Sequence, residues 1–414
     1  MQDKEEGLYA TVMMPVMIEF ISWVLEEAKK AGKKRLYFLA RDGYQMYLTA
    51  QKLCEIKDID IECRYLKVSR YAMRMPEYHL LGEKCVEHIC IGGIDVTTRR
   101  IMRRAGLPEE LAKQYLPDIE DTRILNYQEI MQLKERLRQN RDFLERIYAC
   151  SKEAYEPAMG YLKQEGLLDQ VDYALVDSGW VGTLQQTIAH LVGKPDLEGY
   201  YFGIYETPKA VPPERYHSFY FGPKWGLSRK TRFSNCLFEA IFTSPEGMTL
   251  RYKKDGDKYI TVADFKENPN KIQIESNCRL LEEYMSCYAA CYKKMCESMK
   301  EIGYRERSEF VEKLLNKFMG EPTAFEVEKY GNLLFSDDVL EGNLKKVAAD
   351  LTLEEIVQQR FVNKALIMLG IKKGEIHESA WIEGSIVREG SEVTMALYHA
   401  RLYKYFVYIR KLLK

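Results

Sequence analysis

The feature that most constrains the fold is an apolar strand that runs through a small polar loop into a helix, at residues 173–186. This segment reads YALVDSGWVGTLQQ, so Asp177 stands at the carboxyl end of the strand and Thr183 opens the helix. Backbone N–H groups of the loop are expected to point at an anion, because a helix N-terminus carries about half a positive charge. Gly179 and Gly182 would let a ligand approach the backbone. The segment therefore predicts a phosphate site at the edge of a parallel sheet.

A second segment of the same build lies near the N-terminus. Residues 35–40 (RLYFLA) are typical of a buried strand, Arg41, Asp42 and Gly43 form a turn, and a helix is expected over residues 44–55. In an open parallel sheet, ligands bind beyond the carboxyl ends of the strands, so two such units can contact one molecule from two sides. The pair indicates a ligand with two anionic ends. The alternative is that both are ordinary strand-to-helix turns whose small residues serve backbone geometry.

The rest of the pattern predicts an α/β protein with a mostly parallel sheet flanked by helices. Further strands are expected at 61–68, ending at Ser69 and Arg70, at 199–205 and at 217–221, with a hairpin at 251–262. Helices are expected at 7–30, from 83 to about 166, and beyond 266 apart from a short extended piece near Trp381. The predicted organisation is a core of residues 1–265 with a helical insertion at about 83–166, then a helical C-terminal domain of residues 266–414.

Composition argues for an ordinary soluble protein without a nucleic-acid partner. The 414 residues carry a formal net charge of −1, so no global basic field is present to hold a nucleic acid. The ten cysteines include no Cys-x-x-Cys pair, and Cys287, Cys291 and Cys296 lie in an amphipathic stretch where they are expected to pack. Glu19 interrupts the apolar run at residues 9–25, so a buried helix is expected rather than a membrane span. With no secretory signal evident, we expect a reduced, cytoplasmic protein.

Three segments together indicate a particular family more specifically than composition does. They are FLARDGY (residues 38–44), YLKVSR (65–70) and VDSGWVGTLQ (176–185). The chain resembles a family of bacterial surface-polysaccharide clusters whose members often lie fused behind a haloacid-dehalogenase-type phosphatase. That family is similar to the type I phosphoribosyltransferases, which use phosphoribosyl pyrophosphate (PRPP). The resemblance extends to residues 238–247 and 381–385. It implies a phosphoribosyltransferase-like fold and transfer of 5-phosphoribose from PRPP to a glycan, with release of pyrophosphate. A partner phosphatase would then remove the phosphate, leaving ribofuranose in a capsule or O-antigen.

The resemblance also implies roles for individual residues. Asp177 would hold the ribose hydroxyls, and the loop after it would hold the 5-phosphate. The Arg41 loop would hold pyrophosphate. The substrate-binding residues implied in this way are Asp42, Gly43, Ser69, Arg70, Ser178, Gly179, Trp180, Val181, Gly182 and Thr183, with Arg74 within reach of the same crevice. The sequence departs from the family pattern at Ser178, where a second acid is usual, and at Trp180, where small or hydroxyl residues are common.

The chemistry of this transfer calls for placement and charge stabilisation. Breaking the bond from ribose C1 to pyrophosphate builds negative charge on the leaving group, which Mg²⁺ and a guanidinium group such as that of Arg41 can stabilise. Asp42 and Asp177 are the candidate carboxylates for Mg²⁺, which usually takes few protein ligands besides phosphate and water. Glu239 is the candidate general base for the acceptor hydroxyl. The alternative for Glu239 is a helix-surface or capping carboxylate.

Two rival functions remain open at this point. A glycosyltransferase with a nucleotide-activated sugar could use the Asp177 loop for the diphosphate, and a non-catalytic module could bind a phosphosugar or glycan and scaffold other enzymes. The missing second acid beside Asp177 favours the latter. The Asp-x-Asp signature of the partner phosphatase after an apolar strand is absent, so the phosphatase is expected to be a separate protein. The basic and aromatic segment 398–414 could contact a membrane that carries a lipid-linked acceptor, although packing on the protein body is favoured.

Overall fold

The computed structural model of the chain describes residues 7–92, 96–209, 211–264, 267–295, 303–336, 344–368 and 371–412. Five parallel strands form the central sheet, in the order β2-β1-β3-β4-β5. Their bounds are β1 Arg35–Leu39, β2 Glu62–Leu66, β3 Tyr173–Trp180, β4 Glu198–Ile204 and β5 Tyr216–Phe221. The predicted α/β class with a parallel sheet is confirmed. From β1 the chain first adds β2 on one side and then β3, β4 and β5 on the other side. The switch point therefore lies between β1 and β3, and ligands bind at such points in open sheets of this kind.

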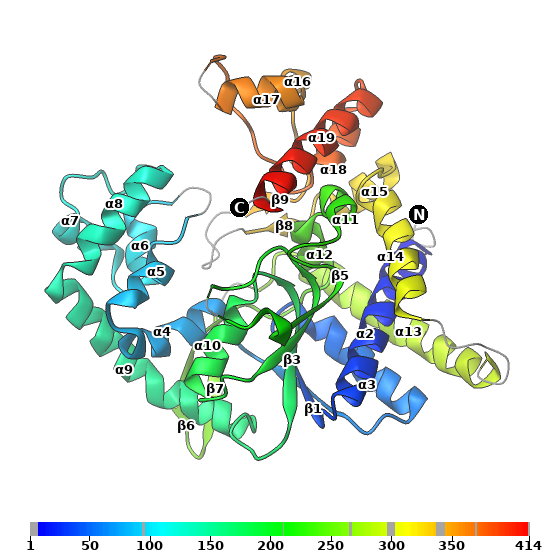
Figure 1. Cartoon of the computed structure of the whole chain (residues 1–414), viewed down its shortest axis with the longest axis horizontal. Coiled ribbons are helices and arrows are strands. Elements are labelled where there is room, and N and C mark those ends of the chain that lie inside the picture. Colours follow the sequence, from blue (N-terminus) through cyan, green and yellow to red (C-terminus); the bar gives the residue numbers. More distant parts are fainter. Residues whose placement is uncertain are drawn as a thin grey trace.

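Helices cover both faces of the sheet (Figure 1). On one face lie α2 (Met14–Lys30), which continues the π-helix Tyr9–Met13, α3 (Gly43–Lys57), α13 (Lys271–Met295) and α14 (Tyr304–Phe318). On the other lie α4 (Arg70–Leu81), α9 (Arg141–Gln164) and α10 (Thr183–Leu191). Alternate side chains of β1 serve the two layers: Leu36 and Phe38 join the core beside α2, whereas Tyr37 and Leu39 join the core beside α9. A strand buried on both faces needs a continuous apolar run, which is why the sequence marks β1 and β3 so clearly.

Residues 83–166 are largely helical as expected, but α9, the last of these helices, covers the sheet, and the part between α4 and α9 has a core of its own. Between α4 and α9 the chain forms short helices whose apolar side chains, among them Val86, Ile101 and Leu133, make a cluster separate from those of the sheet. These helices are a 3₁₀ turn at Gly82–Cys85, α5 Val86–Ile89, α6 Thr98–Arg104, a 3₁₀ turn at Glu109–Leu111, α7 Ala112–Tyr115 and α8 Tyr127–Arg138. The insertion forms the lobe at the left of Figure 1. It faces an antiparallel hairpin of β6 (Thr249–Asp255) and β7 (Lys258–Ala263). This hairpin was predicted at residues 251–262.

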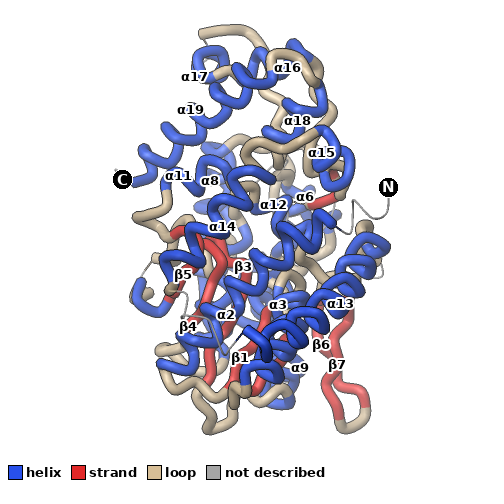
Figure 2. Tube along the Cα trace, turned by 90° about the vertical axis from the view of Figure 1, so that its right-hand side faces the viewer, coloured by secondary structure: helices blue, strands red, loops and turns tan. Residues whose placement is uncertain are grey.

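The C-terminal part is helical and lies beyond α12 at one end of the molecule (Figures 1 and 2). Its helices are α15 Ala324–Tyr330, α16 Leu353–Gln359, α17 Phe361–Met368, α18 Ile382–Glu389 and α19 Val393–Leu412. Three shorter elements precede the β6–β7 hairpin in the chain: a 3₁₀ turn at Pro213–Arg215, α11 Leu227–Arg232 and α12 Asn235–Ile241. The core beside α2 continues into this part through Tyr330, Val347 and Trp381. The boundary at residue 266 stays a prediction.

The expected extended piece near Trp381 is wrong. Trp381 immediately precedes α18, and the short strands are instead β8 (Leu334–Phe335) and β9 (Lys345–Lys346), which pair antiparallel. The Trp381 backbone N–H makes one bond, to the Val347 carbonyl, while its indole N–H donates to the Met319 carbonyl at 2.8 Å. Its apolar character therefore reflects burial of a large ring rather than strand pairing.

Two expectations about surface and membrane contact can be compared with the fold. Among the described residues, Tyr9–Lys30 is the stretch long and apolar enough to cross a membrane, but its apolar side chains are mostly buried in the core beside the sheet. Helix α19 packs on the body through one face, where Tyr408 stacks on Tyr205 with ring centroids 5.6 Å apart. On its other face Tyr398 and Phe406 are 60% and 49% exposed. Contact of that face with lipid stays a prediction.

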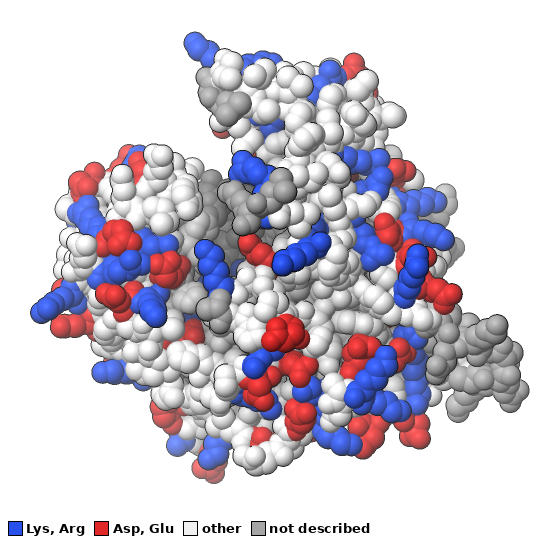
Figure 3. Space-filling model, in the orientation of Figure 1, with Lys and Arg blue, Asp and Glu red and all other residues white. Residues whose placement is uncertain are grey.

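The cysteine prediction needs a correction. Cys287 and Cys291 lie on α13 as expected, but both are exposed rather than packed, because α13 turns these positions to solvent. Cys296 lies outside the described residues. Acidic and basic side chains are interspersed over the face drawn in Figure 3, in keeping with the net charge of −1.

Candidate functional site

A polar cavity of about 190 Å³, here called the crevice, lies at the carboxyl ends of β1 and β3. It collects nearly all the residues predicted for the site. These are Arg41, Asp42, Ser69, Arg70, Asp177, Ser178, Gly179, Trp180, Val181, Gly182, Thr183 and Glu239. Gly43 is not among the lining residues; a Cβ atom there would lie 2.9 Å from the Phe38 backbone, so Gly43 serves the packing of α3 on β1.

The two units meet through a direct hydrogen bond. The chain leaves β1 through a cis peptide bond between Ala40 and Arg41, and Asp42 then precedes α3 without capping it. The Ser178 hydroxyl donates to Asp42 Oδ2 at 2.7 Å, across 136 positions of sequence. Ser178 therefore holds the Asp42 carboxylate at the crevice, a role that its place in the sequence did not reveal.

The loop after Asp177 is shorter than the sequence predicted. Strand β3 continues to Trp180, where Gly179 and Trp180 pair with Gly203 and Ile204 of β4. The Val181 N–H donates to the Gly179 carbonyl at 3.2 Å, so it is used within the turn. The N–H groups that remain to face a ligand are those at the start of α10, since the first turn of a helix has no internal acceptors. The part of the loop that is expected to bind an anion is thus narrowed to Gly182 and Thr183.

Glycine is required in this loop by the protein itself. Gly179 has φ +115°, and a Cβ atom there would lie 2.3 Å from the Gly203 carbonyl oxygen. Gly182 has φ +67°, and a Cβ atom would lie 2.5 Å from the ring of Tyr216. The expected reason, access of a ligand to the backbone, is therefore not needed to explain either glycine.

Three carboxylates share the crevice, and each titrates at a higher pH than usual. Burial raises the pKa of Asp177 well above its usual value, and the charges of Asp42 and Glu239 raise it further. Burial also raises the pKa of Asp42, against the hydrogen bond from Ser178. Burial and then the charge of Asp42 raise the pKa of Glu239 to about 8. Like charges held together in a buried site are costly, and such clusters are common at functional sites.

Glu239 faces the crevice from α12 and does not cap that helix. The hydroxyl of Ser234 caps α12 by accepting from the Leu237 N–H at 3.2 Å. The indole N–H of Trp180 donates to Glu239 Oε1. The end of α12 is anchored by buried Gln45, whose Nε2 donates to the carbonyls of Ile241 at 2.9 Å and Thr243 at 3.1 Å. The capping alternative is therefore wrong, and Glu239 belongs to the crevice.

Arginine side chains surround the acids. Arg70 lines the crevice and is exposed. Its positive charge partly offsets the rise in the pKa values of Asp42, Asp177 and Glu239. Arg41 opposes the rise for Asp42 and Glu239. Arg74 is buried beside the crevice and donates to the Thr183 hydroxyl at 3.2 Å, and burial lowers its pKa to about 10. Ser69 has a structural role, because its hydroxyl caps α4 and donates to the Thr249 carbonyl at 2.6 Å.

A smaller cavity of about 60 Å³ extends the crevice toward the C-terminal part. It shares Arg41, Asp42, Glu239 and Ser336 with the crevice. It adds the polar residues Thr243, Asn268 and Asn270; the sequence analysis missed these three residues and Ser336. No signal singled them out, because asparagine in a loop is commonplace and only the fold brings these loops to the site. Asn268 Nδ2 donates to the Ser244 carbonyl at 3.0 Å and so helps to fix the segment after α12.

No group of three His, Cys, Asp or Glu side chains among the described residues could hold a metal ion by itself. Two carboxylates with raised pKa values, Asp42 and Asp177, nevertheless have the donor chemistry that suits Mg²⁺, and a cation between them would relieve their repulsion. This fits an ion that is completed by substrate oxygens and water rather than by a protein cage.

The ligand-free protein is expected to lose stability as the pH rises from about 5 to 8.5. The folded-state pKa of Glu239 is about 8 whereas its usual value is 4.5, so the folded state binds more protons in this window and a rising pH favours unfolding. The raised pKa values of Asp42 and Asp177 act in the same direction. Thermal melting across this pH range at constant ionic strength would measure the effect, and Glu239→Gln should flatten the slope. A melting temperature that climbs steadily over the range would contradict the assignment.

No protein-family model matches the chain, and no curated protein is significantly similar to it. The functional proposal therefore depends on the geometry of the site.

Proposed function

We propose that this protein is a glycan phosphoribosyltransferase, which transfers 5-phosphoribose from PRPP to a sugar acceptor and releases pyrophosphate. The observation that carries the proposal is the junction of two strand–loop–helix units at the β1/β3 switch point, where Ser178 bonds to Asp42. A donor with a phosphate at one end and a pyrophosphate at the other matches a crevice built from two such units. The parallel sheet is compatible with the type I phosphoribosyltransferase-like fold that goes with this proposal.

In this proposal each unit has a distinct task. The start of α10, with Gly182 and Thr183, would bind the 5-phosphate, and Asp177 would accept hydrogen bonds from the ribose hydroxyls. Arg41 and Arg70 would contact the pyrophosphate, because guanidinium groups fit phosphate oxygens in pairs of hydrogen bonds. Mg²⁺ held by Asp42 and Asp177 would offset negative charge on the leaving group.

The reaction exchanges one bond at the ribose C1 atom for another. The acceptor hydroxyl oxygen forms a bond to C1 while the bond from C1 to the pyrophosphate oxygen breaks, and the bonding electrons leave with pyrophosphate. Glu239 would take the hydroxyl proton. Its pKa of about 8 suits this task, since a base works best when its pKa is near the working pH. The product carries a 5-phosphate, so a separate haloacid-dehalogenase-type phosphatase would complete the synthesis of ribofuranose in a surface polysaccharide.

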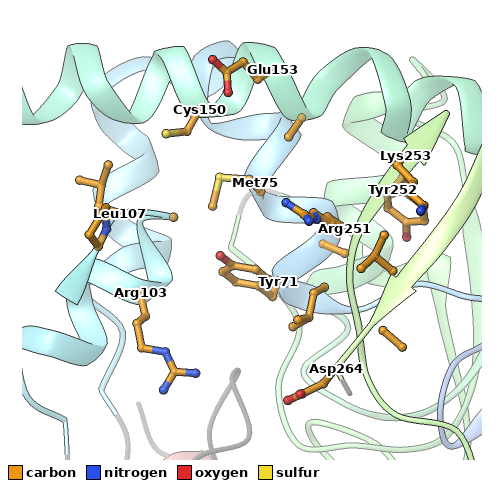
Figure 4. Close-up of a pocket in the computed structure, with 17 residues that line it drawn as sticks. Tyr71, Met75, Arg103, Leu107, Cys150, Glu153, Arg251, Tyr252, Lys253 and Asp264 are labelled. Carbon is orange, nitrogen blue, oxygen red and sulfur yellow. The ribbon is translucent and has the colours of Figure 1, made fainter. Parts of the chain in front are cut away.

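The acceptor would lie in the large cleft beside the crevice. This cleft has a volume of about 840 Å³ and lies between the helical insertion and the β6–β7 hairpin (Figure 4). The first turn of α4 borders both spaces, since Arg70 lines the crevice and Tyr71 lines the cleft. Tyr71 and Arg251 both point into it, and their aromatic face and guanidinium group are suited to stack on sugar rings and to bond their hydroxyls. A cytoplasmic glycan, including one linked to lipid, would have access to such a cleft.

Replacing Tyr71 or Arg251 by alanine is therefore expected to weaken acceptor use and leave donor binding intact. The KM for the acceptor should rise by about tenfold in each variant, which corresponds to loss of one stacking or hydrogen-bonding contact of about 1.4 kcal/mol. Steady-state kinetics with varied acceptor, beside calorimetry with PRPP, would check this. A larger change in PRPP affinity than in acceptor KM would contradict the placement.

The first test is calorimetric titration of the protein with PRPP and Mg²⁺, beside UDP-sugars, repeated with Asp177→Ala. Micromolar PRPP binding that is lost in the variant would support the transferase. A signal with UDP-sugars alone would favour the glycosyltransferase alternative. PRPP binding without turnover on any glycan would favour the scaffold alternative, and absence of PRPP binding would reject the proposed donor.

A further inference from the structure

A separate cavity of about 560 Å³ lies between α10, α4 and the loop before β5. We call it the α10 cavity; its polar lining includes Glu77, His190, Arg215 and Tyr216. No described residue lines both the α10 cavity and the crevice. The proposed transferase reaction makes no use of this space.

Two side chains that line the α10 cavity each carry a buried hydrogen-bond donor that has no protein partner among the described residues. The hydroxyl of Tyr216, a residue only 8% exposed, has no partner among the described residues, and neither has Nη1 of Arg215. Buried polar atoms are nearly always hydrogen-bonded, so each exception calls for a water or ligand. Burial raises the pKa of Tyr216 to about 12, so its hydroxyl keeps its proton near neutral pH and remains a donor.

The acidic group in the cavity is already satisfied. Glu77 accepts from the Thr187 hydroxyl at 2.9 Å through Oε2, and its Oε1 lies 2.8 Å from His190 Nδ1. The two buried atoms left without partners are therefore donors, one of which carries a permanent positive charge. Apolar side chains, among them Leu81, Pro195 and Val211, form the rest of the wall.

We propose that the α10 cavity binds a small phosphate-bearing molecule, whose phosphate oxygens accept from Arg215 Nη1 and the Tyr216 hydroxyl. A phosphate oxygen accepts strong bonds from a guanidinium group, and the cavity is far larger than the roughly 30 Å³ that a water occupies. The apolar wall leaves room for an organic body attached to the phosphate. The ring of Tyr216 also contacts Gly182, so an occupant of the α10 cavity lies one side chain away from the loop of the crevice.

The test is calorimetric titration with inorganic phosphate of the full-length protein and matched variants. We expect Arg215→Gln and Tyr216→Phe each to weaken one phosphate-binding event by at least about tenfold, the loss of one hydrogen bond of about 1.4 kcal/mol. Arg70→Gln should weaken only a second event, at the crevice. Arg136→Gln, which removes an exposed arginine paired with Asp118, should bind phosphate as the unaltered protein does.

Tyr216→Phe decides the matter if Arg215→Gln does not fold, because it removes only a hydroxyl that has no protein partner. Its melting temperature without phosphate should not fall, whereas its stabilisation by phosphate should be reduced. Phosphate binding that is unchanged in both variants, or confined to the event lost in Arg70→Gln, would overturn the inference and leave an ordered water as the partner of Tyr216. Binding that depends on Arg215 in a protein that ignores PRPP would retain this inference and reject the proposed function.

Discussion

Replacing Asp177 by asparagine is expected to abolish transfer while making the ligand-free protein more stable. The Asp177 side chain is half-buried beside Asp42 and Glu239, and its raised pKa shows that its charge is unfavourable in the folded state. A neutral amide of the same shape removes that repulsion, so the melting temperature at pH 8 should rise. PRPP affinity should fall by about 100-fold or more, because a charged hydrogen-bond acceptor and a candidate Mg²⁺ ligand are lost together. Calorimetry with PRPP and thermal melting of the same preparation measure both effects.

Asp172→Asn is the matched control for this experiment. Asp172 lies just before the opposite end of β3, is about half exposed and pairs with Lys33 at 3.2 Å. Lys33 is only 8% exposed but keeps Glu198 as a second partner at 3.0 Å, so the control should retain PRPP binding and show only a small fall in melting temperature. Loss of stability in Asp177→Asn, with PRPP affinity unchanged, would show that Asp177 is a structural residue and would remove the main support for the donor site.

Replacing Glu239 by glutamine is expected to lower kcat by about 10²- to 10⁴-fold with little change in PRPP affinity. In the unaltered protein kcat/KM should rise as the pH approaches about 8 and then level off, because the base must be ionised and its pKa is about 8. The variant should lose that ascending limb. Since glutamine can still accept from the Trp180 indole, the packing around α12 should be preserved.

Glu246→Gln is the comparison for Glu239. Glu246 lies in the same chain segment and pairs with Lys67 at 2.7 Å on the surface, away from the three-carboxylate cluster. It should leave both kcat and the pH profile unchanged. If Glu239→Gln raised the KM for PRPP and left kcat intact, Glu239 would be a binding residue and the general base would have to be sought elsewhere.

The amino-acid pattern was a good guide to the individual elements of the core. Residues 35–40 were expected as a strand, and β1 spans Arg35–Leu39, because a strand buried on both faces must be apolar throughout. The two-residue strands β8 and β9 escaped notice since so short a pairing leaves no periodicity to detect. The extension of β3 to Trp180 also escaped, because Gly179 is typical of a loop and only pairing with Gly203 draws it into the sheet. The Trp381 ring was misread since burial in a helical layer and burial in a sheet select the same kind of residue.

The sequence by itself determined the two strand–loop–helix units and the identity of the acids and arginines placed in their loops. Only the tertiary structure decided that β1 and β3 lie side by side, so that Ser178 reaches Asp42 at 2.7 Å, and that Glu239 joins them from α12. It also decided that Asn268 and Asn270 border the extension of the crevice and that Arg215 and Tyr216 line a cavity of their own. The physical reason is that the period of a segment encodes its local conformation, whereas strand order depends on contacts between distant segments. A pKa likewise depends on burial and on neighbouring charges, which exist only once the chain is folded.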